Sequence, residues 1–193
     1  MGKWRHIGLV CLGILAVSFT GRFANGRGWD RIRLRTLDGK VYGLPNLHKK
    51  LAAIVFLSPE CPLCQNYSLV LNKLQARFGK DLDIAGVFPG KANTPAACLA
   101  FQDKYHIQFL LLTDERMELV KTLGGRITPE VFLLDKDRNV LYQGAIDNWV
   151  AALGKQRNKA TENYLEDGIA SYLSGETVRV KEVKAIGCFI NDR

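Results

Sequence analysis

Apolar residues form one uninterrupted run over residues 51–57, a length that suits a β-strand. A continuous run, without alternation of apolar and polar positions, is typical of a central strand covered on both faces. Beyond it, apolar side chains recur at the helical period, at Leu63, Tyr67, Val70, Leu71, Leu74 and Phe78. Gly79 follows the last of them and predicts the end of the helix. The pattern therefore predicts a buried strand that leads directly into an amphipathic helix.

The rest of the chain alternates between strands and helices. Strands are predicted at residues 83–88, 109–113, 131–134 and 140–142, and the last two form a hairpin across residues 137–139. Further helices are predicted after the capping residue Thr94, at residues 117–123 and at residues 162–173, whereas the polar stretch 148–161 is assigned no element. This order predicts an α/β fold with a central mixed β-sheet flanked by helices.

A short hairpin is predicted before this unit, as an N-terminal extension of the sheet. Residues 31–35 alternate between arginine and apolar side chains, so Arg31, Arg33 and Arg35 are expected to share one solvent-exposed face of a strand. Asp38 and Gly39 predict the turn, after which residues 41–42 return along the first strand.

The first two dozen residues have the pattern of a secretory signal peptide. Lys3, Arg5 and His6 precede an apolar run over residues 7–19, which is shorter than the ~20 residues of a comfortable membrane span. Small residues at 16 and 18 offer a cleavage site, and the alternative is an uncleaved anchor. We expect an extracytoplasmic protein, periplasmic or secreted, in an oxidising compartment.

Three regions follow from these patterns. Residues 1–24 are a signal peptide or N-terminal anchor, residues 30–175 form the folded domain, and residues 176–193 are a C-terminal tail that contains Gly187 and Cys188. With 193 residues, 47% of them hydrophobic, the chain can bury a full core. The net charge is +8, but no Lys/Arg run is interleaved with aromatic residues, so nucleic acid is not an expected partner. Membrane contact is expected only if the N-terminal segment is not cleaved.

Two cysteines, Cys61 and Cys64, lie three positions apart where the predicted strand meets the helix. Pro62 suits the first helical position, which places Cys61 at the helix N-terminus. Free N–H groups and the positive end of the helix dipole stabilise a thiolate there, and the pKa of Cys61 is expected below the ~8.5 of free cysteine. Cys64, one turn further on, is the candidate resolving thiol. Half of a zinc site and an inert structural bridge are the alternatives, but no second cysteine pair at similar spacing supports zinc.

A second candidate element is Thr128-Pro129, directly before a predicted strand. A strand, Cys-x-x-Cys, a helix, a strand–helix unit, Thr-Pro before a strand, a hairpin and a last helix together resemble the thioredoxin fold. Residues 56–67, 86–90, 127–135 and 141–144 carry the likeness, which covers about residues 30–175. More closely, the chain resembles exported redoxins of the alkyl hydroperoxide reductase/thiol-specific antioxidant-like superfamily, which includes membrane-tethered thiol–disulfide oxidoreductases.

The resemblance implies a thiol–disulfide oxidoreductase in which Cys61 attacks, Cys64 resolves, and Pro129 is cis and packs over the two sulfurs. It implies that the Thr128 backbone pairs with an extended substrate segment. No cofactor or metal beyond the redox-active disulfide is expected. The implied partners are protein thiols and disulfides outside the cytoplasm, with a redox-recycling partner that the sequence does not identify.

The chain departs from thioredoxin itself at one position with chemical consequences. Thioredoxin carries a buried acid in the strand six residues before its first cysteine, and here that position is Val55. Glu60, beside Cys61, and Glu130, beside Pro129, are the candidates for accepting the proton of Cys64. The alternative interpretation of each glutamate is a solvated charge on the surface.

Two rival functions fit the same fold. A thiol peroxidase of this superfamily would carry a proline seven residues and a Thr/Ser three residues before its reactive cysteine. For Cys61 only Ser58 fits, because residue 54 is isoleucine. A copper-binding assembly factor would place its cysteines one residue further apart and add a histidine, for which His48 and His106 are the candidates.

The remaining cysteines are not assigned chemistry. Cys11 lies within the apolar N-terminal run, and Cys98 falls on the apolar face of its helix, where a buried unreactive thiol is expected. For Cys188 three alternatives stay open: a disulfide with Cys98, docking at the active site as an extra resolving thiol, or simple packing.

Overall fold

The computed structural model describes residues 28–191 of the chain. The predicted signal peptide or anchor, including Cys11, lies outside this range. Among the described residues no helix combines the length and apolar character needed to cross a bilayer.

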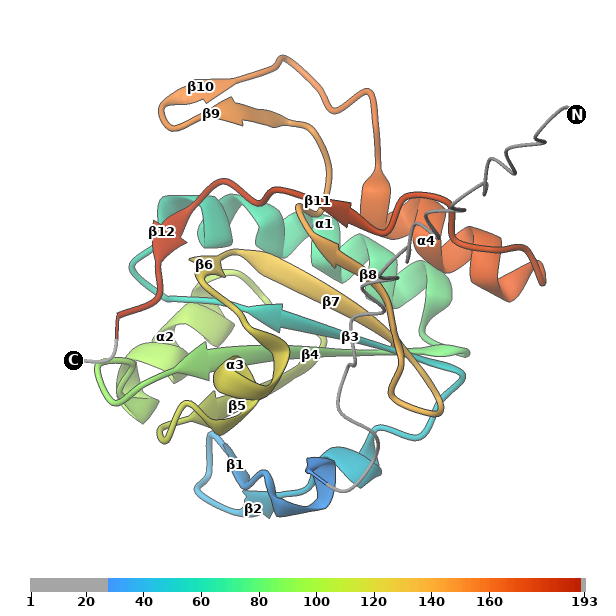
Figure 1. Ribbon diagram of the computed structural model, residues 1–193. Coiled ribbons are helices and arrows are strands. Elements are labelled where there is room, and N and C mark those ends of the chain that lie inside the picture. The colour runs from blue at the N-terminus through green and yellow to red at the C-terminus, as the bar shows by residue number, and fades with distance from the viewer. Residues whose placement is uncertain (1–27, 192–193) are drawn as a thin grey trace, which may run out of the picture.

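A mixed sheet of eight strands forms the centre of the fold, in the order β11-β8-β7-β3-β4-β5-β1-β2 (Figure 1). β3, β4 and β5 run parallel to one another, and β7 pairs antiparallel with β3. The strands of this sheet are β1 Leu34–Thr36, β2 Val41–Tyr42, β3 Leu51–Phe56, β4 Leu82–Pro89, β5 Leu110–Asp114, β7 Glu130–Asp135, β8 Val140–Gly144 and β11 Glu182–Val183. The predicted mixed sheet is confirmed.

Helices cover both faces of this sheet. The helices are α1 Pro62–Phe78, α2 Pro95–Lys104, α3 Glu118–Leu123 and α4 Tyr164–Leu173. Buried side chains of α1, α2 and α4 join one hydrophobic cluster, whereas those of α3 and of the two short 3-10 turns, Trp29–Arg31 and Leu44–Asn46, join the other. The sheet therefore lies between two apolar layers.

β3 is the central strand that its apolar run predicts. All six residues are buried, with Ala53 and Val55 in the layer of α1 and Ile54 and Phe56 in the opposite layer. α1 follows it with the predicted face buried at Leu63, Tyr67, Leu71 and Leu74, while Val70 and Phe78 are partly buried. The predicted strand–helix unit is confirmed.

The N-terminal hairpin forms with one correction. β1 and β2 pair across the Asp38-Gly39 turn, with Gly39 at φ +85°, and β1 extends the sheet antiparallel to β5. Arg31 lies in a 3-10 turn and not in the strand, so the three arginines do not alternate along a single element. The turn buries Trp29 and Ile32 instead, because these apolar side chains reach the core there.

The polar stretch 148–161 contains a hairpin that the sequence pattern does not predict. β9 Val150–Ala152 pairs antiparallel with β10 Lys155–Gln156 across a turn with Gly154 at φ +75°. Most of its side chains are exposed, so alternation of apolar and polar residues, the usual mark of a strand, is missing. Figure 1 shows this hairpin projecting from the body of the domain.

The segment after α4 returns to the domain at two places. β11 pairs parallel with β8, and Gly144, at φ +120°, makes this possible because a Cβ there would lie 1.7 Å from the carbonyl oxygen of Val183. Further on, β12 Cys188–Phe189 pairs antiparallel with β6 Ile127–Thr128, a two-stranded ladder separate from the main sheet (Figure 1). The tail is thus hydrogen-bonded to the domain.

Candidate functional site

The cysteine pair lies where β3 ends and α1 begins, as predicted. Cys61 is the N-cap residue of α1, and Pro62 is the first helical residue, where a proline leaves no hydrogen bond unmade. The N–H of Cys61 donates to the carbonyl of Ser58 at 3.2 Å, and the Cys61 carbonyl accepts the first helical hydrogen bond from Gln65 at 3.1 Å. The loop is therefore fixed on both sides of the first thiol.

The Cys61 sulfur is buried and acidic. A hydrogen bond from the Cys64 thiol lowers the pKa of Cys61 to about 4, with further help from the Cys188 thiol and from the backbone of residues 63–64. Burial, which leaves the residue 2% exposed, opposes this shift but does not outweigh it. A thiolate at the start of a helix is the form that attacks disulfides.

Cys64 has the opposite character. It is completely buried, and burial is the main reason why its pKa is well above the ordinary value, followed by its hydrogen bond to Cys61 and the charge of Cys61. The Ser58 N–H lies 3.4 Å from its sulfur and partly offsets this effect. One turn of helix thus holds a thiolate and a protonated thiol side by side.

Thr128 and Pro129 complete the wall of the site. The Thr128-Pro129 peptide bond is cis, as the resemblance implies. The Thr128 carbonyl oxygen lies 3.2 Å from the Cys61 sulfur and accepts its proton when Cys61 is a thiol. Pro129 also lines a cavity of about 190 Å³, together with Tyr67 and Asp147.

The cavity contains a buried polar pair that the sequence pattern does not reveal. The hydroxyl of Tyr67 donates to Asp147 Oδ1 at 2.6 Å, and the N–H of Trp149 donates to the same oxygen at 2.8 Å. Burial, then the hydrogen bond and charge of Asp147, raise the pKa of Tyr67. The hydrogen bond between Tyr67 and Asp147 therefore connects α1 to the segment before the β9–β10 hairpin.

Cys188 is the residue of the site whose position the sequence leaves open. β12 places it opposite Thr128, and its sulfur lies 2.9 Å from the sulfur of Cys61. Burial, the hydrogen bond to Cys61 and the charge of Cys61 raise the pKa of Cys188 to about 11. Of the three alternatives, docking at the cysteine pair is therefore the observed one.

Cys98 is not the partner of Cys188. It is fully buried, its sulfur lies 3.8 Å from the Asn93 carbonyl oxygen, and burial raises its pKa to about 12. An unreactive thiol in the core is what its position on the helix predicts.

The two candidate proton acceptors do not reach Cys64. The Glu130 carboxylate accepts hydrogen bonds from the backbone N–H groups of Arg126, at 2.8 Å, and Ile127, at 3.3 Å. Glu60 is exposed and lines a surface hollow beside Cys188. Within residues 28–191 neither glutamate forms a hydrogen bond to Cys64, so the structure does not bring these two predicted residues to the resolving thiol.

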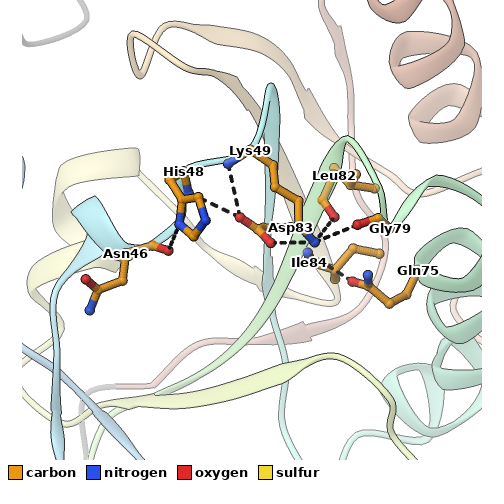
Figure 2. A network of polar contacts seen from close by, with 8 residues as sticks. All are labelled: Asn46, His48, Lys49, Gln75, Gly79, Leu82, Asp83 and Ile84. Carbon is orange, nitrogen blue, oxygen red and sulfur yellow. Dashed lines mark hydrogen bonds and ion pairs between the residues drawn. The ribbon is translucent and has the colours of Figure 1, made fainter.

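The two histidines of the copper alternative lie away from the thiols. Figure 2 shows His48 before the start of β3, its ring against the Asn46 carbonyl at 2.8 Å, with its backbone N–H and that of Lys49 donating to Asp83. His106 lies in the turn between α2 and β5, also at the opposite end of the parallel strands from Cys61. Among the described residues no cluster of three or more His, Cys, Asp or Glu could hold a metal ion.

The chain matches a known family and known relatives in sequence. The family model described as Redoxin matches residues 21–155. The thiol–disulfide oxidoreductase ResA of Bacillus anthracis is 26% identical over 160 residues, which cover 78% of this chain and 87% of that protein.

Solved structures share the fold. A hypothetical protein of Sinorhizobium meliloti superposes with a TM-score of 0.73 at 25% identity, over 82% of this chain and 88% of its own. A secreted disulfide oxidoreductase of Mycobacterium tuberculosis superposes with a TM-score of 0.55 at 18% identity, over 75% of this chain and 98% of its own. The thioredoxin-like fold that the sequence predicts is confirmed.

Proposed function

The chain belongs to the redoxin family, and from this premise we propose that it is a thiol–disulfide oxidoreductase whose redox pair is Cys61 and Cys64. The class is supported by its likeness to the Bacillus oxidoreductases. The observation that carries the assignment to these two residues is their placement, with Cys61 at the N-cap of α1 and Cys64 fully buried one turn further on. The pKa of Cys61 is lowered there and that of Cys64 is raised.

The chemistry follows from this asymmetry. In the reducing direction, the Cys61 thiolate attacks one sulfur of a partner disulfide, the partner's other sulfur leaves as a thiolate, and a mixed disulfide forms. Cys64 then gives up its proton and attacks the Cys61 sulfur, and the second partner sulfur leaves. The products are a Cys61–Cys64 disulfide and a partner that has gained two electrons, one proton from Cys64 and a second proton from solvent.

The difference in protonation decides the order of the two attacks. Cys64 is completely buried and protonated, whereas Cys61 is ionised and joins the wall formed by Thr128 and Pro129. Neither Glu60 nor Glu130 contacts the Cys64 thiol. The partner thiolate that leaves in the first step is therefore the base that accepts the proton of Cys64. The backbone of residues 63–64, directly after Pro62, helps to lower the pKa of Cys61, so Cys61 is again a thiolate once the pair has been reduced.

We propose protein disulfides outside the cytoplasm as the substrates, and a protein dithiol as the recycling partner. The pattern of the first 24 residues supports export, and the similar M. tuberculosis oxidoreductase is described as secreted. No group other than the disulfide is required by the steps above.

A redox titration tests the assignment. The protein is equilibrated with oxidised and reduced dithiothreitol over a range of ratios, free thiols are alkylated, and masses are read. We expect Cys61 and Cys64 to become protected from alkylation together, as one two-electron couple. For such a couple, a tenfold change in the ratio of disulfide to dithiol corresponds to about 30 mV in potential. The variants Cys61→Ser and Cys64→Ser remove that couple. Alkylation of both thiols at every ratio would refute the proposal.

A further inference from the structure

Three sulfurs meet at Cys61, but they differ in their access to solvent. Cys61 is 2% exposed and Cys64 is completely buried, whereas Cys188 is exposed on β12. The Cys188 sulfur nevertheless lies 2.9 Å from that of Cys61. A partner that approaches the folded domain therefore meets Cys188 before it meets the Cys61–Cys64 pair.

The position of Cys188 is fixed by contacts of β12 and of the residues on either side of it. The N–H of Ile190 donates to the Arg126 carbonyl at 2.9 Å, and the hydroxyl of Thr128 donates to the Cys188 carbonyl at 3.4 Å. Gly187 allows the two backbones to approach, because a Cβ there would lie 2.1 Å from the Thr128 carbonyl oxygen. These contacts occupy the backbone of β6 that would otherwise face an incoming chain.

We propose that Cys188 is a third redox-active thiol of this site, which forms a disulfide with Cys61 and passes it to partner thiols at the surface. This inference rests on the proposed function, because it takes the Cys61–Cys64 disulfide as its starting point. According to this proposal, the exposed Cys188 sulfur exchanges with the recycling partner, and β12 remains paired with β6.

The first step is an exchange within the protein. The Cys188 thiolate attacks the Cys61 sulfur of the Cys61–Cys64 disulfide, the Cys188–Cys61 bond forms, and Cys64 leaves as a thiolate that takes up a proton equivalent to the one that Cys188 lost. No net oxidation occurs. In the disulfide Cys61 carries no charge, so the charge and hydrogen bond of Cys61 that raise the pKa of Cys188 in the reduced protein are absent at this stage.

The second step involves the partner, a protein dithiol. Its thiolate attacks the exposed Cys188 sulfur, and Cys61 leaves as a thiolate. The second partner thiol then closes the partner's own disulfide and releases Cys188, so that two electrons have passed from the partner to the protein. The low pKa of Cys61 favours this course, because the thiol with the lower pKa leaves faster.

Access supports the same site of attack. Cys188 lines a surface hollow of about 150 Å³ together with Ser58, Asn93 and Phe189, and the Phe189 side chain is 76% exposed. The Cys61 sulfur is enclosed by Thr128 and by β12, so a direct attack on it requires β12 to move.

Disulfide mapping of the full chain tests the first step. The Cys64→Ser variant is oxidised with diamide and digested with trypsin without reduction, which releases Cys61 on residues 51–73 and Cys188 on residues 185–193. We expect these two peptides to be joined in most of the protein, and residues 92–104, which carry Cys98, to stay free. Absence of the joined pair would overturn the proposal.

Kinetics test the second step. The oxidised wild type and the oxidised Cys188→Ser variant are mixed with dithiothreitol, and reduction of the Cys61–Cys64 disulfide is followed by quenched alkylation. We expect the variant to be reduced at least about tenfold more slowly, because the attacking thiol must then reach a buried sulfur. Equal rates would overturn the proposal.

The matched control is Cys98→Ala, which removes a thiol outside the site and is expected to be reduced at the wild-type rate. Failure of the proposed function gives a different result from failure of this inference. In the first case no Cys61–Cys64 disulfide forms in either the wild type or Cys188→Ser. In the second it forms in both and is reduced equally fast.

Discussion

A Cβ atom on Gly187 would lie 2.1 Å from the carbonyl oxygen of Thr128, a distance that side chains do not tolerate. Only a glycine lets the backbone of β12 come this close to β6. The next residue is Cys188, whose sulfur then lies 2.9 Å from that of Cys61. The absence of a side chain at one position thus sets the distance between two thiols.

Gly187→Ala is expected to displace β12 while every thiol is retained. We expect Cys188 to be alkylated by iodoacetamide several-fold faster, because its hydrogen bond to Cys61 is lost, and the free energy of unfolding to fall by roughly 1–3 kcal/mol. Alkylation is read on residues 185–193, and unfolding in urea. Gly39→Ala is the control: at φ +85° it is strained but has nothing within 4 Å, so it should not change Cys188 alkylation.

The acidity of Cys61 predicts an unusual pH profile for alkylation. With a pKa of about 4, Cys61 remains a thiolate at pH 5, so its alkylation rate, relative to that at pH 8, should hardly fall over this range. The rate at Cys188, whose pKa is raised to about 11, should fall about tenfold per pH unit. Quenched alkylation with fragment masses separates the sites. A midpoint for Cys61 near 8.5 would contradict the assignment.

The same shift makes the stability of the reduced protein depend on pH. The pKa of Cys61 is lowered on folding, from 9.0 to about 4, so the unfolded chain binds more protons between these values. The contribution of Cys61 to the free energy of unfolding is therefore complete above about pH 9 and is lost as the pH falls toward 4. Urea unfolding of the wild type and of Cys61→Ser measures it, and the difference between them should shrink as the pH is lowered.

Replacing both Cys64 and Cys188 with serine is expected to trap the mixed disulfide. Cys61 can still attack a partner disulfide, but both thiols that lie beside its sulfur are lost, so multiple-turnover reduction should fall by about 100-fold or more. The covalent adduct is detected by mass under non-reducing conditions, and Cys61→Ser, which lacks the attacking sulfur, should form none. Cys64→Ser alone should accumulate less of the adduct, because Cys188 releases the partner when it forms its disulfide with Cys61. Rapid turnover by the double variant would contradict the role of these two thiols.

Tyr67→Phe tests the buried pair formed by Tyr67 and Asp147, which lines the same cavity as Pro129. The Tyr67 hydroxyl donates to Asp147 at 2.6 Å inside the protein, and removing it should lower the free energy of unfolding by about 1.5–3 kcal/mol. Tyr164→Phe is the matched control, because its hydroxyl donates to Glu162 at 2.7 Å but the bond is exposed, and a change within about 0.5 kcal/mol is expected. Equal effects measured in urea would contradict the importance of burial.

Much of the site could be predicted because its information is local. The apolar run of β3, Pro62 after Cys61 and the periodic face of α1 occupy adjacent stretches of sequence, and each follows from backbone and packing preferences. Cys188 could not be placed in this way. Its partner Thr128 lies 60 residues earlier, and nothing in the order of residues near Gly187 indicates which strand it will meet. The β9–β10 hairpin is not predictable for a different reason, because its exposed side chains show no alternation of apolar and polar residues.

The pairing of β11 with β8 has a practical consequence for shortened forms of the protein. A chain cut after Leu173 would leave β8 as a bare border strand, and unprotected strands of this kind are where separate molecules join into aggregates. The same cut would also remove β12, which covers the sulfur of Cys61. A deletion would therefore confuse loss of solubility with loss of chemistry, whereas a change of a single residue, such as Cys188→Ser, keeps the two apart.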